Sequence, residues 1–95
     1  MIFPETYQKD IDTAIRILKE EGCSEVYIFG SIASGEAKFD SDIDIAVKGI
    51  KKGSFLKIYA KLTIALEHQV DFVDLNSNKR FTKHIFETGD IIRVA

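Results

Sequence analysis

Two aspartates spaced two residues apart, Asp42 and Asp44, are the residues of this chain best suited to chemistry. Side chains at alternate positions of a β-strand point to the same face, so these carboxylates would project together while Ile43 and Ile45 face a core. Neighbouring carboxylates repel one another, and a cation, a shared proton or bulk water must relieve that repulsion. We favour a divalent metal, because Mg²⁺ prefers oxygen ligands and binds through one or two carboxylates plus substrate phosphates. The pair therefore predicts a site for Mg²⁺ and a nucleoside triphosphate.

A glycine-serine turn, Gly30-Ser31, lies upstream of the two aspartates. It follows a short apolar run from Glu25 to Phe29 that is typical of a strand. Gly30 can adopt backbone angles closed to other residues and lets a ligand approach the main chain closely. Ser31 offers a hydroxyl and N–H groups to phosphate oxygens, and a helical turn beginning there would add a favourable dipole. We therefore expect Gly30 and Ser31 to bind the phosphates of a nucleotide.

The spacing of Gly30 and Gly35 also matches a Walker A loop, which continues with a lysine and a hydroxyl residue. In this chain the next residues are Glu36 and Ala37. The two side chains that contact phosphate and Mg²⁺ in that loop are missing, so the sequence excludes a P-loop ATPase.

The Gly30-Ser31 turn, the short glycine-containing loop and the segment Ser41-Asp42-Ile43-Asp44, in this order and spacing, resemble the minimal nucleotidyltransferases of the DNA polymerase beta superfamily. The resemblance covers most of the chain. It implies an enzyme that transfers a nucleoside monophosphate, with ATP as the donor and two Mg²⁺ ions as cofactors. It also implies a nucleotidyltransferase fold of the α/β (α+β) class, with a mixed sheet of about four to five strands and helices packed against it.

The same resemblance implies a third metal-binding carboxylate on a later strand, where Asp71 and Asp74 are the candidates. Three residues separate them along the chain, so on a regular strand they point to opposite faces and cannot both serve. The family pattern, an aspartate between apolar residues at the strand start, matches Asp71. We therefore expect Asp42, Asp44 and Asp71 to be the catalytic metal ligands, with Asp74 as a surface or capping group.

One segment departs from the family pattern. Many members carry an arginine in the loop after the glycine-serine turn, where this chain has Ile32, Ala33 and Ser34. We expect Lys38 or a partner's side chain to supply the missing positive charge.

The elements that must position these residues are expected in the order helix, strand, loop, strand, helix, strand, helix, strand. Pro4 suits the first turn of a helix that Gly22 ends, and Ser54 can cap a second helix. Asn76 or Ser77 would start a third helix that ends near Gly89. The final apolar stretch, from Ile91 to Val94, is typical of a closing edge strand. The expected helical stripes are Ile11, Ala14, Ile15 and Leu18, then Phe55, Ile58, Tyr59, Leu62 and Leu66, and last Phe81 and Ile85.

Length and composition indicate one domain over residues 1–95, with 45% hydrophobic residues and a net charge of −2. The mild acidity argues against nucleic acid as a partner, although Lys79, Arg80 and Lys83 form a small basic group on an expected helix face. There is no signal-peptide pattern and no apolar run long enough to span a bilayer, so we expect a cytoplasmic protein that does not engage membranes.

The remaining polar side chains carry little signal. Cys23 cannot form an internal disulfide and is expected to be a small buried thiol near a helix end. His68 and His84 lack the spacing of metal ligands, and the three tyrosines are expected to be core or surface residues without a chemical role.

The acceptor of the nucleotide is the open question. After Asp71 the chain offers little sequence for an acceptor domain, so we expect the acceptor pocket to come from another chain. Family members of this size resemble antitoxins that transfer AMP to a tyrosine of a helical HEPN-type toxin, and we expect that partner here. Two alternatives remain. The chain could modify a small molecule, such as an antibiotic, as a homodimer, or it could be a binding module that inhibits its partner without catalysis.

Overall fold

The structure is a computed structural model that describes residues 3–37 and 41–95. Within these residues four helices and four strands alternate along the chain. The order agrees with the prediction except that the expected loop between the first two strands contains a short helix, α2 (Ser31–Ser34). None of the helices formed by the described residues is long and apolar enough to cross a membrane. The elements in chain order are α1 (Glu5–Glu20), β1 (Glu25–Phe29), α2 (Ser31–Ser34), β2 (Ile43–Lys48), α3 (Phe55–Ala65), β3 (Val70–Asp74), α4 (Lys79–Thr88) and β4 (Ile91–Arg93).

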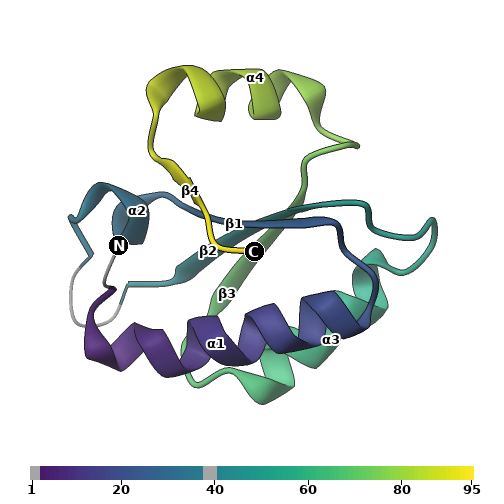
Figure 1. Cartoon of the computed structure of the whole chain (residues 1–95), viewed down its shortest axis with the longest axis horizontal. Helices are drawn as coiled ribbons and strands as arrows, with labels where there is room; N and C mark the ends of the chain where they lie inside the picture. The colour runs from purple at the N-terminus through teal and green to yellow at the C-terminus, as the bar shows by residue number, and fades with distance from the viewer. Residues whose placement is uncertain (1–2, 38–40) are drawn as a thin grey trace.

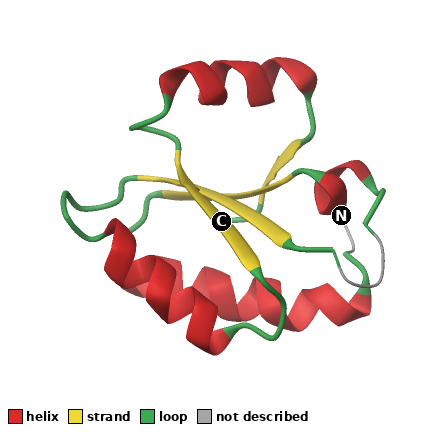
Figure 2. Cartoon of the chain, turned by 180° about the vertical axis from the view of Figure 1, so that it is seen from behind, coloured by secondary structure: helices red, strands yellow, loops and turns green. Residues whose placement is uncertain are grey.

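The described strands form one mixed sheet in the order β3-β2-β1-β4. β1 pairs antiparallel with β2 and with β4, whereas β2 and β3 are parallel. A parallel pair needs a crossover connection, and α3 supplies it. Helices α1 and α3 lie side by side on one face of the sheet and α4 lies alone on the other, which Figures 1 and 2 show from opposite sides. The expected mixed α/β architecture is confirmed.

Each face of the sheet has its own apolar cluster, and β2 divides its residues between the two. Ile43, Ile45 and Val47 pack into the larger cluster with α1 and α3. Ala46 belongs to the smaller cluster, which includes Ile85 of α4. Because strand side chains alternate between faces, Asp44 shares the α4 face with Ala46. The core on the α1 and α3 side therefore fixes which way Asp44 points.

Most helix boundaries lie where the sequence placed them, with two corrections. Pro4 precedes α1 as its N-cap residue rather than lying in its first turn. The third expected helix, α4, begins at Lys79 with Asn78 as its N-cap, later than Asn76 or Ser77. The reason is that Asp74 accepts hydrogen bonds from the Asn76 N–H (3.0 Å) and the Ser77 hydroxyl (2.8 Å), which hold these residues in a turn.

Other predictions for the ends of helices and for the last strand agree with the structure. Ser54 is the N-cap residue of α3, although its side chain makes no capping hydrogen bond. Gly89 ends α4 in the left-handed conformation. β4 is an edge strand, as expected for the final apolar stretch.

Asp10 of α1 is a charged side chain buried against the loop between α3 and β3, with 2% of its surface exposed. Its carboxylate accepts the N–H groups of Glu67 (3.0 Å to each oxygen) and His68 (2.9 Å), and a 2.8 Å hydrogen bond joins it to Nδ1 of His68. Burial raises the pKa of Asp10, but the hydrogen bonds from Glu67 and His68 outweigh it and hold the pKa below its ordinary value. Asp10 therefore ties α1 to the loop that leads into β3.

We expect Asp10→Asn to lower the free energy of unfolding by about 2–4 kcal/mol, because an amide group would present its own N–H groups to donors that need an acceptor. Urea denaturation at pH 7 measures the loss. Asp12→Asn is the matched control, since Asp12 lies on the exposed side of the same helix and accepts a hydrogen bond from the side chain of Gln8. Equal stability of the two variants would contradict the role given to Asp10.

Candidate active site

The first two predicted site residues lie at the start of β2. Asp42 is exposed and directly precedes β2. The strand begins at Ile43, so it carries Asp44 but not Asp42, whereas the sequence analysis placed both aspartates on the strand. Asp44 is the second residue of the strand and is partly buried. Ile43 and Ile45 are fully buried on the opposite face, so the expected separation into an acidic and an apolar face holds at Asp44.

The register of the parallel pair distinguishes the two candidates for a third carboxylate. Asp71 pairs with Asp44, and Asp74 pairs with Val47. Paired residues of neighbouring strands point to the same face, so Asp71 lies on the face of Asp44, while Asp74 lies with Val47 on the α3 side. Asp71 is exposed, whereas Asp74 is engaged by Asn76 and Ser77. The structure thus brings Asp71 next to Asp44 and separates Asp74 from it.

Gly30 brings the predicted phosphate-binding turn against Asp44. Phe29 at the end of β1 pairs with Asp44, and Gly30 follows with a φ of +72°. A Cβ atom at Gly30 would lie 2.1 Å from Oδ2 of Asp44, far inside van der Waals contact. Only glycine lets the Asp44 carboxylate lie this close to the turn. The Gly30 N–H donates to the Asp90 carbonyl (3.2 Å), so any phosphate contacts in this turn would fall to Ser31 and the N–H groups after it.

The residues after Gly30 form the short helix α2, which Gly35 ends in the left-handed conformation. Ile32 is buried in the core at 3% exposure and anchors this helix to the sheet. Ala33 and Ser34 complete the helix without adding a charge. Lys38, the residue expected to supply a positive charge, lies outside the described residues.

The electrostatics of the site centre on Asp44. Burial raises its pKa from 3.8 to about 6, and the negative charges of Asp71 and Asp42 add to the shift. Within residues 3–37 and 41–95 no hydrogen-bond donor offsets it. A divalent cation would supply the missing positive charge, and carboxylate oxygens are the ligands that Mg²⁺ prefers. The donor chemistry of Asp42, Asp44 and Asp71 therefore fits such an ion.

The three carboxylates do not form a ready-made coordination shell. In the part of the chain that the structure describes, no three carboxylate, imidazole or thiol side chains lie close enough together to hold one metal ion. Asp42, Asp44 and Asp71 share an electrostatic field, and binding an ion would require their side chains to turn toward one another.

The sequence analysis did not identify the polar side chains that lie on the α1 side of the sheet, opposite Asp44. Tyr7 and Asp10 lie on the buried side of α1, at helical spacing from Ile11, Ala14 and Leu18. An aspartate within an apolar stripe is the one available signal, because a buried carboxylate requires hydrogen-bond partners. His68, expected at the surface or as a cap, is instead half-buried between Asp10 and the ring of Tyr7.

The other polar residues match their expected roles. Cys23 is buried just after α1, and burial raises the pKa of its thiol. Lys79, Arg80 and Lys83 are exposed on α4, as expected for a solvated helix face, and His84 is exposed beside them.

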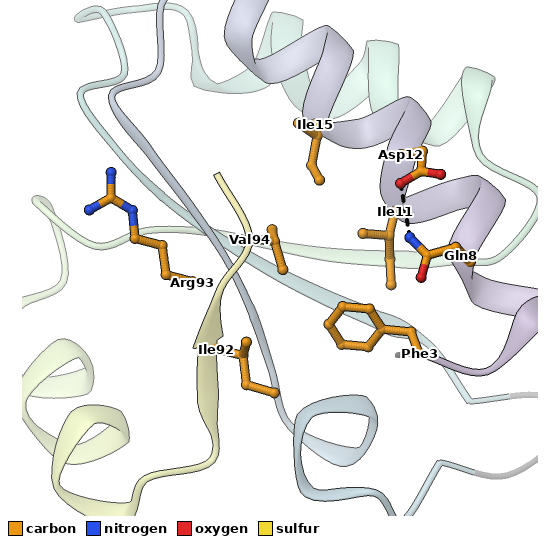
Figure 3. A pocket seen from close by; sticks show the side chains of 8 residues that line it. All are labelled: Phe3, Gln8, Ile11, Asp12, Ile15, Ile92, Arg93 and Val94. Carbon is orange, nitrogen blue, oxygen red and sulfur yellow. Dashed lines mark hydrogen bonds between the residues drawn. The ribbon is translucent and has the colours of Figure 1, made fainter. Parts of the chain in front are cut away.

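Two hollows border helices α1 and α2. One of about 570 Å³ adjoins α2, and its lining is Phe3, Pro4, Ile32, Ala33, Ser34, Gly35 and Ala37. Another of about 320 Å³ lies between α1 and β4 (Figure 3). Five of its lining side chains are apolar, and Gln8 and Asp12 of the lining are joined by a hydrogen bond (Figure 3). The second hollow contains none of the predicted site residues.

Comparison with known proteins relates this geometry to a family. Residues 12–94 match the family described as polymerase beta, nucleotidyltransferase. No curated protein sequence matches the chain.

Solved structures give three relatives of similar fold. A chain from a toxin-antitoxin structure with AMP-PNP is 29% identical, with a TM-score of 0.70 over 90% of this chain and 69% of that one. A chain from the structure of tri-AMPylated Shewanella oneidensis HEPN toxin in complex with MNT antitoxin is 26% identical, with a TM-score of 0.68 over 90% of this chain and 69% of that one. A candidate minimal nucleotidyltransferase is 30% identical, with a TM-score of 0.71 over 93% of this chain and 92% of that one.

Neutralising Asp44 should stabilise the metal-free protein. A carboxyl whose pKa is raised from 3.8 to about 6 on folding costs stability as the pH rises through this range, so Asp44→Asn removes a cost that is small at pH 4 and complete at pH 7.5. We expect a gain of about 1–2 kcal/mol at pH 7.5, since a half-buried carboxylate keeps part of its solvation. Urea denaturation at both pH values measures it. Asp74→Asn is the control and should not stabilise, because Asp74 accepts two hydrogen bonds. A destabilised Asp44→Asn protein at pH 7.5 would be contrary to this account.

The close approach of Asp44 to Gly30 can be tested with a double-mutant cycle. A side chain at Gly30 would be strained by the backbone there (φ +72°, ψ −146°) and by contact with the Asp44 carboxylate. Truncating Asp44 to alanine removes the contact and leaves the backbone strain. We therefore expect Gly30→Ala to cost about 1–2 kcal/mol more in the unchanged chain than in the Asp44→Ala background. Chemical denaturation measures both losses, and equal losses would show that the Asp44 carboxylate does not lie against Gly30.

Proposed function

This chain belongs to the polymerase beta nucleotidyltransferase family, and on that premise we propose that it uses Mg²⁺ to transfer AMP from ATP to a hydroxyl group of a partner protein. The observation that carries the proposal is the position of Asp44. Its half-buried carboxylate lies against the Gly30 turn and beside two further carboxylates, with its pKa raised to about 6. Such a charge is stabilised by a divalent cation and by the nucleotide that arrives with it.

The three aspartates have distinct roles in this proposal. Asp42 and Asp44 would hold the Mg²⁺ that accompanies the nucleotide, and Asp44 with Asp71 would hold a second ion. When bound, the ions supply charge neutralisation on the phosphates and lower the pKa of the attacking hydroxyl. The pairing of Asp44 with Asp71 across β2 and β3 supports the central place of Asp44, which has a carboxylate neighbour on each side.

The reaction is an in-line displacement at phosphorus. The acceptor oxygen forms a bond to the α-phosphorus, the bond from that phosphorus to the oxygen bridging the β-phosphate breaks, and pyrophosphate leaves. The hydroxyl proton passes to solvent. We assign the leaving group to the turn at Gly30 and Ser31, because the first N–H groups of a helix favour an anion and α2 begins at Ser31.

We further propose that the acceptor is a tyrosine of a HEPN-type toxin and that this chain acts as its antitoxin. The support is the likeness to a chain from the structure of a tri-AMPylated HEPN toxin in complex with MNT antitoxin. A second toxin-antitoxin structure contains AMP-PNP, an ATP analogue. The charge that Ile32, Ala33 and Ser34 do not provide in the loop would then come from the partner or from Lys38.

Labelled ATP tests this function. We expect the chain, incubated with Mg²⁺, α-labelled ATP and the protein encoded by the neighbouring gene, to place label on that protein. Asp42→Asn, Asp44→Asn and Asp71→Asn should each reduce the rate on the order of 10²-fold or more, because an amide cannot balance the charge of the ion. Asp74→Asn is the control and should keep its activity.

Other outcomes would replace this function with a different one. Label on a small molecule instead of a protein would indicate a transferase of the antibiotic-modifying kind. Tight complex formation with no label would indicate a binding module that inhibits without catalysis. Loss of activity in Asp74→Asn with full activity in Asp71→Asn would assign the third ligand to Asp74.

A further inference from the structure

Two tyrosines on different helices make the same contact with the two strands that carry the site. The hydroxyl of Tyr7, on α1, donates to the carbonyl oxygen of Ser41 (3.1 Å). The hydroxyl of Tyr59, on α3, donates to the carbonyl oxygen of Val70 (3.0 Å). Ser41 directly precedes Asp42, and Val70 directly precedes Asp71. Each hydroxyl therefore holds the peptide group that leads into a proposed metal ligand.

The planarity of the peptide bond makes this contact a constraint on the aspartate. The carbonyl of one residue and the nitrogen and Cα of the next lie in one rigid plane. A hydrogen bond that orients the Ser41 carbonyl thus orients the backbone from which the Asp42 side chain departs, and the Val70 carbonyl does the same for Asp71. The Ile43 N–H also donates to the Gln69 carbonyl (2.8 Å), which ties the beginnings of the two strands together.

Both tyrosine rings are held by their surroundings. Tyr7 is 2% exposed, and its ring lies against the ring of His68 with centroids 4.3 Å apart. His68 is in turn held by the buried carboxylate of Asp10. Tyr59 packs edge-on against Phe55 and Phe72, each with centroids 5.9 Å away. The hydroxyls therefore act from fixed positions, at little further cost in side-chain entropy.

Neither tyrosine is placed to touch the reacting groups. α1 and α3 cover one face of the sheet (Figures 1 and 2). Strand alternation and the pairing of Asp44 with Asp71 direct both side chains to the other face. The hydroxyls donate to backbone carbonyl groups at the beginnings of β2 and β3. Any effect on catalysis must pass through the positions of Asp42 and Asp71.

We propose that Tyr7 and Tyr59 are positioning residues, which hold Asp42 and Asp71 where they can share a divalent cation with Asp44. This inference rests on the proposed function, because it requires the three aspartates to bind that cation. It assigns a role to two tyrosine hydroxyls for which the sequence predicted no chemical role.

Three tyrosine-to-phenylalanine variants of the full chain test the proposal, since each removes one hydroxyl and keeps the ring. Tyr7→Phe and Tyr59→Phe remove the proposed contacts. Tyr27→Phe is the matched control, because the Tyr27 hydroxyl bonds to the Glu25 side chain at the other end of β1. We expect Tyr7→Phe and Tyr59→Phe each to weaken Mn²⁺ binding by about 10-fold, the scale known for groups that orient metal ligands, and Tyr27→Phe to bind Mn²⁺ like the unchanged chain. Titration calorimetry with Mn²⁺ alone measures this.

A second readout separates positioning from general support of the fold. Tyr7→Phe and Tyr59→Phe should lower kcat for nucleotide transfer while leaving KM for ATP within about 2-fold, because the phosphate-binding turn is untouched. If either variant does not fold, the other carries the test alone.

The proposal is overturned if both variants bind Mn²⁺ as tightly as Tyr27→Phe does. It is also overturned if all three variants lose affinity in proportion to their loss of stability. Failure of the proposed function would look different, because the unchanged chain itself would then bind Mn²⁺ no better than Asp44→Asn.

Discussion

The candidate site depends on one carboxylate, Asp44, for which residues 3–37 and 41–95 supply no hydrogen-bond donor. Asp44 is half-buried, lies against Gly30, and has the charges of Asp71 and Asp42 beside it, so its pKa is raised to about 6. Such an arrangement costs stability at neutral pH, and the larger apolar core on the opposite face of β2 supplies the stability that lets it persist. The positive φ of Gly30 and the register of β2 and β3 are the local conditions that make this arrangement fit.

Asp10 is a buried aspartate whose carboxylate, unlike that of Asp44, accepts several hydrogen bonds. It is more deeply buried than Asp44, yet its pKa is lowered, because Glu67 and His68 donate hydrogen bonds to it. Asp10 accepts hydrogen bonds and holds a loop, whereas Asp44 accepts none from the described residues and, in the proposed function, would bind a cation. Asp10 also supports the region around Asp44, since the loop that Asp10 holds leads into β3 and His68, which donates to Asp10, packs on Tyr7.

The sequence was sufficient where the relevant pattern is local. Strand alternation placed Asp44 on a polar face and separated Asp71 from Asp74, and the apolar stripes identified α1 and α3. The start of α4 was misplaced because the side chain of Asp74 forms a turn that competes with the helix. The sequence could not reveal contacts between segments that lie far apart along the chain. The contacts of Tyr7 with Ser41 and of Asp10 with His68 form only on folding, and no periodicity in the sequence predicts either pair.

The most direct test of this account is the pKa of Asp44, measured by ¹³C NMR titration of its carboxyl group with and without Mg²⁺. The account predicts a pKa of about 6 without the ion and a value at least about one unit lower with it, because a bound cation favours the ionised form. An ordinary pKa that Mg²⁺ does not change would contradict the claim that this carboxylate is the centre of a cation-dependent site.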